Sequence, residues 1–155
     1  MPYLKVEASI DGADVDELFA HIERFETYPD IADNVRAVTV SDRTQDTFTS
    51  CWEVNFRNGI LKWEELDSID RENHRITFSQ LQGDLASFTG KWIVDAVDGG
   101  ARVEFSGEFD LGIPSLASML DPVAVRTLTS NVRELIEAFG VAAGTPVSSF
   151  TAQDA

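Results

Sequence analysis

Two carboxylates and a tryptophan occupy alternate positions of the stretch WEELD, as Trp63, Glu65 and Asp67. In a β-strand, residues two apart point to the same face of the sheet, so an extended backbone here brings the three side chains together. A carboxyl group held among aromatic rings has a raised pKa, and it can take a proton from a carbon acid and later return it. The stretch therefore predicts general acid–base chemistry if its face of the strand lines a cavity.

The turn before this stretch indicates where that face points. An Asn-Gly pair at 58–59 is typical of a two-residue hairpin loop. Counting outward from it places Glu53 opposite Glu64, and Trp52 opposite Glu65. Like charges directly across a strand pair are tolerated only where water screens them. The face of the two opposed glutamates is therefore predicted to be outside, and the tryptophan face inside.

The predicted inner face is mostly apolar, but polar residues interrupt it. Its apolar members are Trp52, Val54, Phe56, Leu61, Trp63, Phe78, Phe88, Trp92, Phe105 and Phe109, and its polar members are Ser50, Glu65, Asp67 and Gln80. Burying an unpaired carboxylate costs several kcal/mol, so a solid core would not hold two of them. Either they reach solvent at the rim of the sheet or they line a cavity. We favour the cavity for Glu65, and both alternatives stay open for Asp67.

A polar residue also interrupts the last predicted helix. Apolar residues follow helical spacing from about 115 or 122 to 139, and Gly140 ends the pattern. The inward stripe includes position 131, which is asparagine. Asn131 is either a satisfied amide at the edge of the core or a hydrogen-bonding group that points into a cavity.

The order of the predicted elements places these residues on one fold. A strand over YLKVEASI precedes two short helical segments in DGADVDELFAHIERF and ETYPDIADN, and six strands follow at about 35–42, 47–57, 60–69, 74–82, 86–97 and 101–111. Short hairpin links indicate an antiparallel sheet. We predict an α+β helix-grip domain over residues 1–140, in which a curved sheet of about seven strands wraps around the long C-terminal helix. Residues 141–155 are predicted to be a flexible tail.

Composition excludes several classes of function. The net charge of −15 disfavours nucleic acid and anionic membrane surfaces as partners. No apolar run approaches the roughly 20 residues that span a bilayer, so no membrane insertion is expected. With Cys51 as the single cysteine, no intrachain disulfide forms, and no Cys/His spacing suggests zinc. The start MPYLKVEASI lacks the features of a signal peptide, and a cytoplasmic protein is expected.

Several segments resemble a known family. They are ETYPDI, WEVNFRNGILKWEE, FTGKWIVDAVDGGARVEFSGEFDLGIP and SNVREL. Over about residues 3–139, the chain resembles the START-like helix-grip (SRPBCC) superfamily, and within it most the bacterial polyketide aromatase/cyclases. The resemblance implies an aromatic cavity that receives a poly-β-ketone, often delivered by an acyl carrier protein. It also implies aldol cyclisation and dehydration without a cofactor, as in antibiotic biosynthesis.

The resemblance also implies roles for single residues. Asn131 matches the family's cavity asparagine, Trp63 and Trp92 match cavity tryptophans, and Tyr28 lies in the short helix at the family's pocket mouth. Asp67 and Gln80 stand where the best-known aromatases have arginines. We expect Glu65 and then Asp67 to transfer protons and Asn131 to polarise a carbonyl. The expected ligand-binding residues are Tyr28, Trp52, Trp63, Phe78, Gln80, Phe88, Trp92 and Phe105, with no metal.

Other functions stay open beside a cyclase. The same cavity suits a non-catalytic carrier of a hydrophobic aromatic metabolite or lipid, and the acidic surface suits an interaction module for a basic partner. The expected partner is a hydrophobic small molecule or a polyketide bound to an acyl carrier protein, and the chain is expected to be a monomer or homodimer. Carrier proteins of this type are usually acidic themselves, so the charge of −15 counts against simple electrostatic docking.

Overall fold

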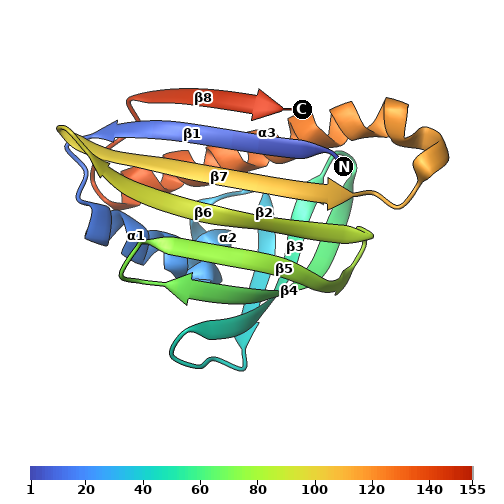
Figure 1. Cartoon of the computed structure of the whole chain (residues 1–155), viewed down its shortest axis with the longest axis horizontal. Coiled ribbons are helices and arrows are strands. Elements are labelled where there is room, and N and C mark those ends of the chain that lie inside the picture. Colours follow the sequence, from blue (N-terminus) through green and yellow to red (C-terminus); the bar gives the residue numbers. More distant parts are fainter. Residues whose placement is uncertain (155) are drawn as a thin grey trace.

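A single antiparallel sheet forms the body of the protein (Figure 1), in a computed structural model that describes residues 1–154. Its eight strands lie in the order β2-β3-β4-β5-β6-β7-β1-β8. Their bounds are β1 (Tyr3–Asp11), β2 (Val35–Ser41), β3 (Thr47–Phe56), β4 (Gly59–Asp70), β5 (Arg75–Gly83), β6 (Ser87–Val97), β7 (Gly100–Asp110) and β8 (Ser149–Asp154). The predicted strands all form, and β8 is an addition that the sequence did not predict.

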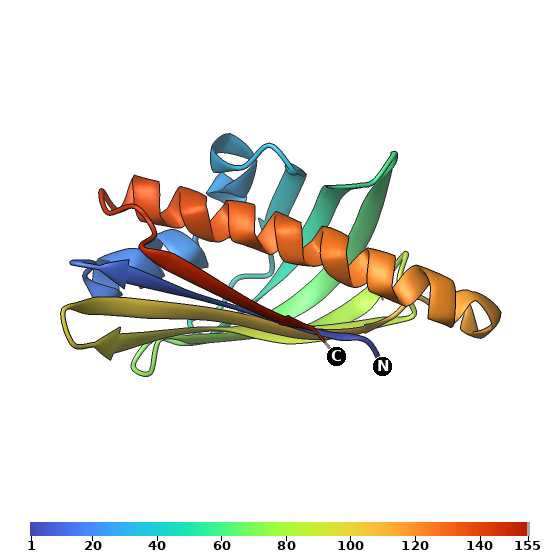
Figure 2. The same cartoon turned by 90° about the horizontal axis from the view of Figure 1, so that it is seen from above.

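The helices lie on one face of this sheet. After β1 come α1 (Val15–Glu23), the short 3-10 turn η1 (Phe25–Thr27) and α2 (Tyr28–Ile31), and after β7 come η2 (Pro114–Leu116) and α3 (Ala117–Ala142). Figure 2 shows α3 lying across the sheet, which bends so that β2, β3 and β4 rise beside the helix. The predicted helix-grip is confirmed. The buried stripe of α3 is Ala124, Val125, Leu128, Val132, Leu135, Ile136, Phe139 and Gly140.

The β3–β4 hairpin differs from the prediction by two residues of register. Its loop is 57–58, with Arg57 at a positive φ of 57°. Trp52 consequently lies opposite Trp63 rather than opposite Glu65. Because side chains alternate with a period of two, a shift of two residues keeps every side chain on its predicted face.

The predicted opposition of Glu53 and Glu64 is wrong, although the face on which they lie is the outer one, as predicted. Glu53 lies opposite Lys62, with which it forms an ion pair of 3.1 Å, and Glu64 lies opposite Cys51. The two glutamates therefore do not oppose each other, and water is not needed to screen them. The outer face is nevertheless outside, as the exposed Cys51 shows.

Close packing against a glycine brings one aromatic ring into the interior. Gly90 lies opposite Gly107 in β6–β7, and Phe78 of β5 lies beside Gly90 in β5–β6. A Cβ at position 90 would approach Cζ of Phe78 to 2.6 Å. The missing side chain thus provides the space in which the Phe78 ring packs.

The C-terminal segment corrects a further prediction. α3 continues past Gly140 to Ala142, and β8 then pairs antiparallel with β1. The Phe150 ring packs against the core, and the guanidinium of Arg133 lies 4.7 Å from its centroid. The prediction of a flexible tail is therefore wrong for residues 149–151. The free edge of β1 supplies backbone partners there that local sequence does not reveal.

No helix within residues 1–154 is long and apolar enough to cross a bilayer.

Candidate functional site

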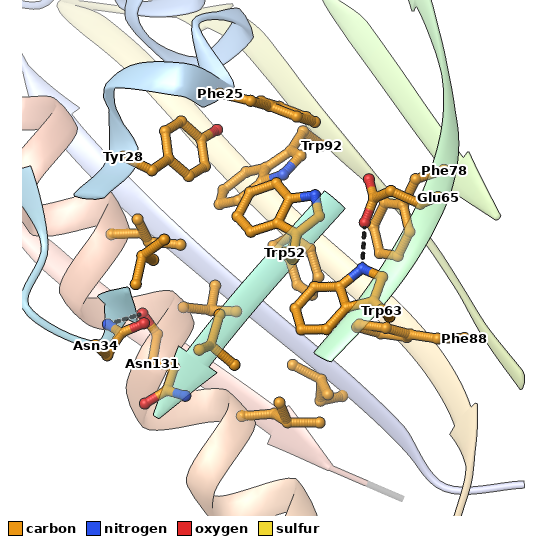
Figure 3. Close-up of a pocket in the computed structure, with 17 residues that line it drawn as sticks. Phe25, Tyr28, Asn34, Trp52, Trp63, Glu65, Phe78, Phe88, Trp92 and Asn131 are labelled. Carbon is orange, nitrogen blue, oxygen red and sulfur yellow. Dashed lines mark hydrogen bonds between the residues drawn. The ribbon is translucent and has the colours of Figure 1, made fainter. Parts of the chain in front are cut away.

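A pocket lies between α3 and the inner face of the sheet (Figure 3). Its lining is apolar and aromatic, with two asparagines and one carboxylic acid. The lining residues are Leu4, Phe25, Tyr28, Asn34, Val35, Trp52, Val54, Trp63, Glu65, Phe78, Phe88, Trp92, Phe105, Leu128, Asn131, Val132 and Leu135. The predicted cavity is thus present, and Trp52, Trp63, Phe78, Phe88, Trp92 and Phe105 line it as expected.

The space inside this pocket is narrow. About 70 Å³ is open to the centre of a water-sized molecule, and the whole empty volume, open solvent included, is about 600 Å³. One water molecule requires about 10–15 Å³ of the first kind of space. The pocket as it stands therefore holds a few waters, and a polyketide chain would require its walls to move apart.

Two tryptophans form a parallel pair in the wall. The Trp52 and Trp63 rings are stacked, with an interplanar angle of 1° and centroids 5.5 Å apart. Phe25 packs edge-on against Trp52 at 5.2 Å, and Phe88 packs edge-on against Trp63 at 5.5 Å. These contacts hold the indoles in one orientation, since aromatic pairs prefer such tilted arrangements.

Glu65 is the only carboxylic acid among the lining residues, and it is 3% exposed. The indole nitrogen of Trp63 donates a hydrogen bond of 2.6 Å to its Oε1 (Figure 3). Burial raises the pKa of Glu65 well above its usual range, and the neighbouring Asp67 carboxyl group raises it further. The Trp63 bond opposes this shift but does not outweigh it. Burial among aromatic rings therefore favours the protonated form of Glu65.

Asp67 lies behind Glu65 and is fully buried. The Ser50 hydroxyl donates a bond of 2.6 Å to its Oδ2, and the Trp52 indole nitrogen donates one of 2.8 Å to the Ser50 hydroxyl oxygen. Burial raises the pKa of Asp67 to about 6, and the neighbouring Glu65 and the hydrogen bond from Ser50 oppose this rise. Neither alternative left open for Asp67 holds, because it reaches neither the rim nor the pocket wall. We call Glu65, Asp67, Ser50 and the two indole nitrogens the acid end.

A β-bulge adjoins the acid end. The pairing of β4 with β5 runs from Glu64 opposite Gln82 to Glu65 opposite Gln80, so Leu81 is the extra residue. Its side chain is 55% exposed. Bulges twist a strand locally and re-aim side chains, and they are common beside active sites.

A second polar group, the amide end, comprises Asn34, Asn55, Asn131 and Glu134. The side-chain nitrogen of Asn131 donates to the backbone oxygen of Asn55 at 3.1 Å, and that of Asn34 donates to the backbone oxygen of Asn131 at 3.3 Å. The backbone nitrogen of Asn34 donates to Glu134 at 3.3 Å. Figure 3 shows Asn131 and Glu65 on different sides of the pocket. The structure thus does not bring the predicted polariser to the predicted acid.

Two other predicted ligand residues are placed differently from the expectation. Gln80 is not among the lining residues, and its nitrogen donates to the backbone oxygen of Leu85 at 2.8 Å. Tyr28 lines the pocket but is fully buried rather than at a mouth, and its hydroxyl donates to the backbone oxygen of Ile22 at 2.5 Å. Only the ring of Tyr28 is therefore available to a ligand.

Sequence reasoning missed Phe25 and Asn34 as lining residues, and although it placed Ser50 on the inner face with Asp67, it assigned Ser50 no role. The hydroxyl of Ser50 on the inner face was a usable signal, since a buried hydroxyl requires a partner. Asn34 precedes β2 and carries no pattern of its own. Among residues 1–154, no group of three or more His, Cys, Asp and Glu side chains is placed to hold a metal ion.

Comparison with solved structures supports the fold. The structure of TTHA0849 from Thermus thermophilus matches with a TM-score of 0.84 and 21% identity, covering 91% of this chain and 96% of that chain. The Zhui aromatase/cyclase from a Streptomyces species matches with a TM-score of 0.77 and 16% identity, covering 92% and 96%. The ginseng major latex-like protein 151 from Panax ginseng matches with a TM-score of 0.68 and 17% identity, covering 86% and 94%. At these identities the likeness shows the fold alone.

Sequence comparison shows the family. No curated protein matches the sequence. The family described as polyketide cyclase / dehydrase and lipid transport matches residues 12–136, which is most of the chain. The matched segment contains the acid end and every pocket-lining residue except Leu4, and the chain belongs to the polyketide cyclase / dehydrase and lipid transport family.

Proposed function

We propose that the protein binds a poly-β-ketone or a related aromatic intermediate in its pocket and promotes aldol cyclisation and loss of water. The observation that carries the proposal is Glu65, a buried carboxyl group in an aromatic wall with a second carboxyl behind it. Family membership supports a cyclase-like or ligand-binding role at a coarser level.

The two carboxyl groups suit a reaction in which protons are removed and returned. We assign the resting proton to Glu65, because burial raises its pKa well above its usual range, and the negative charge to Asp67, whose pKa is raised only to about 6. Passage of this proton to Asp67 frees Glu65 to take a proton from the carbon between two ketones, so the pair then holds two. The resulting enolate attacks a second ketone, a carbon–carbon bond forms, and the alkoxide takes one proton back from Glu65.

Loss of water follows with the same groups. The pair again takes a proton from the carbon next to the new hydroxyl, and it gives a proton to that hydroxyl, which leaves as water. The pair ends with the single proton with which it began, so no cofactor or other reactant is required. The aromatic walls contribute by holding a flexible chain in one folded arrangement.

The proposed proton transfer by Glu65 and Asp67 does not require an arginine in the pocket. None of the pocket-lining residues is arginine or lysine, and Asp67 and Gln80 stand at the positions where the best-known aromatases have arginines. A protonated Glu65 can donate a hydrogen bond to a ketone oxygen, which stabilises the enolate that develops there. We therefore assign to Glu65 both the donation and the removal of protons. Asp67 is assigned to accept and return a proton, so that Glu65 can be either protonated or ionised.

The test is the product formed from a linear poly-β-ketone thioester. We expect Glu65→Gln to abolish correctly cyclised product, while Glu64→Gln, on the outer face of the same strand, retains it. Chromatography with mass spectrometry distinguishes cyclised and dehydrated products from those that form spontaneously. Full product from Glu65→Gln would remove the assignment.

A non-catalytic carrier of a hydrophobic metabolite is the second candidate. It is favoured by the amide nitrogens of Asn131 and Gln80, which are bonded to backbone oxygens and do not polarise a ligand in this arrangement. Incubation with an aromatic polyketide followed by mass spectrometry separates the two functions. Recovery of a tightly bound and chemically unchanged ligand selects the carrier.

A further inference from the structure

The two ionisable groups at the acid end of the pocket, Glu65 and Asp67, are both carboxyl groups. None of its lining residues is lysine, arginine or histidine, and Glu65 is a lining carboxylic acid. A ligand carboxylate or phosphate placed there would meet no cation and would lie against an acidic pair. An anionic ligand is therefore disfavoured at this end of the pocket.

Within residues 1–154, no cationic side chain forms an ion pair with Glu65 or Asp67. Asp67 receives one hydrogen bond from Ser50 on Oδ2, whereas its Oδ1 is buried without a hydrogen-bond partner among the described residues. Asp67 is 0% exposed, so water does not screen its charge. A buried carboxylate is costly until a positive group approaches it. A ligand cation at Glu65 would supply that group.

The surrounding rings favour a cation as well. The indole nitrogens of Trp52 and Trp63 donate to Ser50 and Glu65, and the Tyr28 hydroxyl donates to the backbone. These donors are thus not free to bind an anion, and the residues offer their π systems to the pocket instead. The faces of such rings attract ammonium groups within about 6 Å.

We propose that the pocket selects cationic ligands, and that its acid end binds the protonated amine of a small aromatic or hydrophobic molecule in preference to the neutral isostere. The corresponding carboxylate is rejected. This inference concerns the charge of the ligand and does not rest on the proposed cyclase activity.

Three probes of matched shape test it: benzylamine, benzyl alcohol and benzoate, each titrated into the full chain at pH 7.5. All three tryptophans of the sequence line the pocket, so their fluorescence reports on binding there, and calorimetry gives the dissociation constants independently. We expect benzylamine to bind at least about tenfold more tightly than benzyl alcohol, and benzoate not to bind.

Variants locate the source of the preference. Glu65→Gln and Asp67→Asn should each bring benzylamine and benzyl alcohol to within about threefold of each other, while the outer-face control Glu64→Gln keeps the wild-type ratio. Circular dichroism confirms that each variant is folded, and if Asp67→Asn fails to fold, Glu65→Gln alone decides.

Several results overturn the inference. They are equal binding of the amine and the alcohol, binding of benzoate, no binding of benzylamine at millimolar concentration, or a preference that survives Glu65→Gln. Cyclised product from a protein without amine preference would overturn this inference and leave the cyclase proposal intact. Amine preference without any cyclised product would support this inference and overturn the cyclase proposal.

Discussion

The acid end and the amide end meet the same apolar pocket but are bonded in different ways. At the acid end, the hydrogen bonds stay within the sheet: Ser50 of β3 bonds to Asp67 of β4 at 2.6 Å, and the two indole bonds each lie within one strand. At the amide end, side chains bond to backbone oxygens of other elements, as Asn131 of α3 does to Asn55 of β3 at 3.1 Å. One end bonds within the sheet, and the other ties the long helix to it.

This difference indicates that the acid end serves the chemistry of the pocket, whereas the amide end stabilises the fold. The backbone hydrogen bonds between β3 and β4 already hold these strands together, so the side-chain bonds of the acid end are not needed for that. Its buried carboxyl groups are costly to the fold and have raised pKa values. Groups that cost stability and are poised to exchange protons are typical of functional sites, whereas satisfied amides between elements are typical of structural ones.

The largest expected contrast is between Glu65→Gln and Asn131→Ala in product formation. Loss of a general acid–base group lowers turnover by about 100- to 10,000-fold, so we expect Glu65→Gln to fall in this range with little loss of thermal stability. Asn131→Ala should keep turnover within about tenfold and lower stability instead, since it loses its bond to the Asn55 backbone. Turnover and melting temperature of both variants measure the contrast, and a comparable loss of turnover in both would contradict it.

The next contrast is in the pH dependence of stability. Burial raises the pKa of Asp67 from 3.8 to about 6, so the folded state binds this proton more tightly than the unfolded state. The contribution of Asp67 to stability therefore falls as pH rises between about 4 and 6, and the full penalty from this group above that range is about 3 kcal/mol. Asp67→Asn has no such titration, so its stability relative to wild type should increase by more than about 1 kcal/mol from pH 5 to pH 7.5.

Urea unfolding at the two pH values measures this change. The control is Asp98→Asn in the exposed β6–β7 loop, whose stability should follow the wild type. An Asp67→Asn variant that also runs parallel to the wild type would mean that Asp67 titrates normally.

The inward-facing side chains of β3 and β4 could be predicted because side chains alternate between the two faces of a strand, and this alternation survives a two-residue error in register. The true β3–β4 loop lies one residue earlier than the Asn-Gly pair, which shifts every cross-strand partner by two. A period-two pattern returns to the same face after such a shift, so Trp52, Trp63 and Glu65 were still placed inside. Cross-strand partners depend on the turn itself, which explains why the faces were right and the pairs were wrong.

The features that were missed depend on contacts between distant segments. The depth of Asp67 is set by elements that cover the sheet, which the strand pattern does not encode. β8 forms on the free edge of β1, more than a hundred residues away in the chain. The bond of Asn131 to Asn55 similarly joins α3 to β3, so its helix position could show that it faces inward but could not show what it meets.

A smaller effect is expected at Ser50, within the acid end. Ser50→Ala removes the hydrogen bond to Oδ2 of Asp67 and leaves a buried oxygen without its donor, at a cost of about 1–3 kcal/mol. That bond lowers the pKa of Asp67, so the variant should also raise it. Denaturant unfolding with Ser68→Ala, on the outer face of β4, as the control measures the cost. Equal stability of the two variants would show that Ser50 does not hold the carboxylate.

The smallest effect is expected at the amide end. Asn34→Ala removes the side-chain bond to the backbone oxygen of Asn131, and it should lower the free energy of unfolding by about 0.5–1.5 kcal/mol. Since the acid end is untouched, the ratio of benzylamine to benzyl alcohol affinity should stay at its wild-type value. Ser130→Ala, on the exposed side of α3, serves as the control for stability. A changed ligand ratio in Asn34→Ala would mean that the two ends act on the ligand together, because bonds that only hold α3 in place cannot alter which charge the pocket prefers.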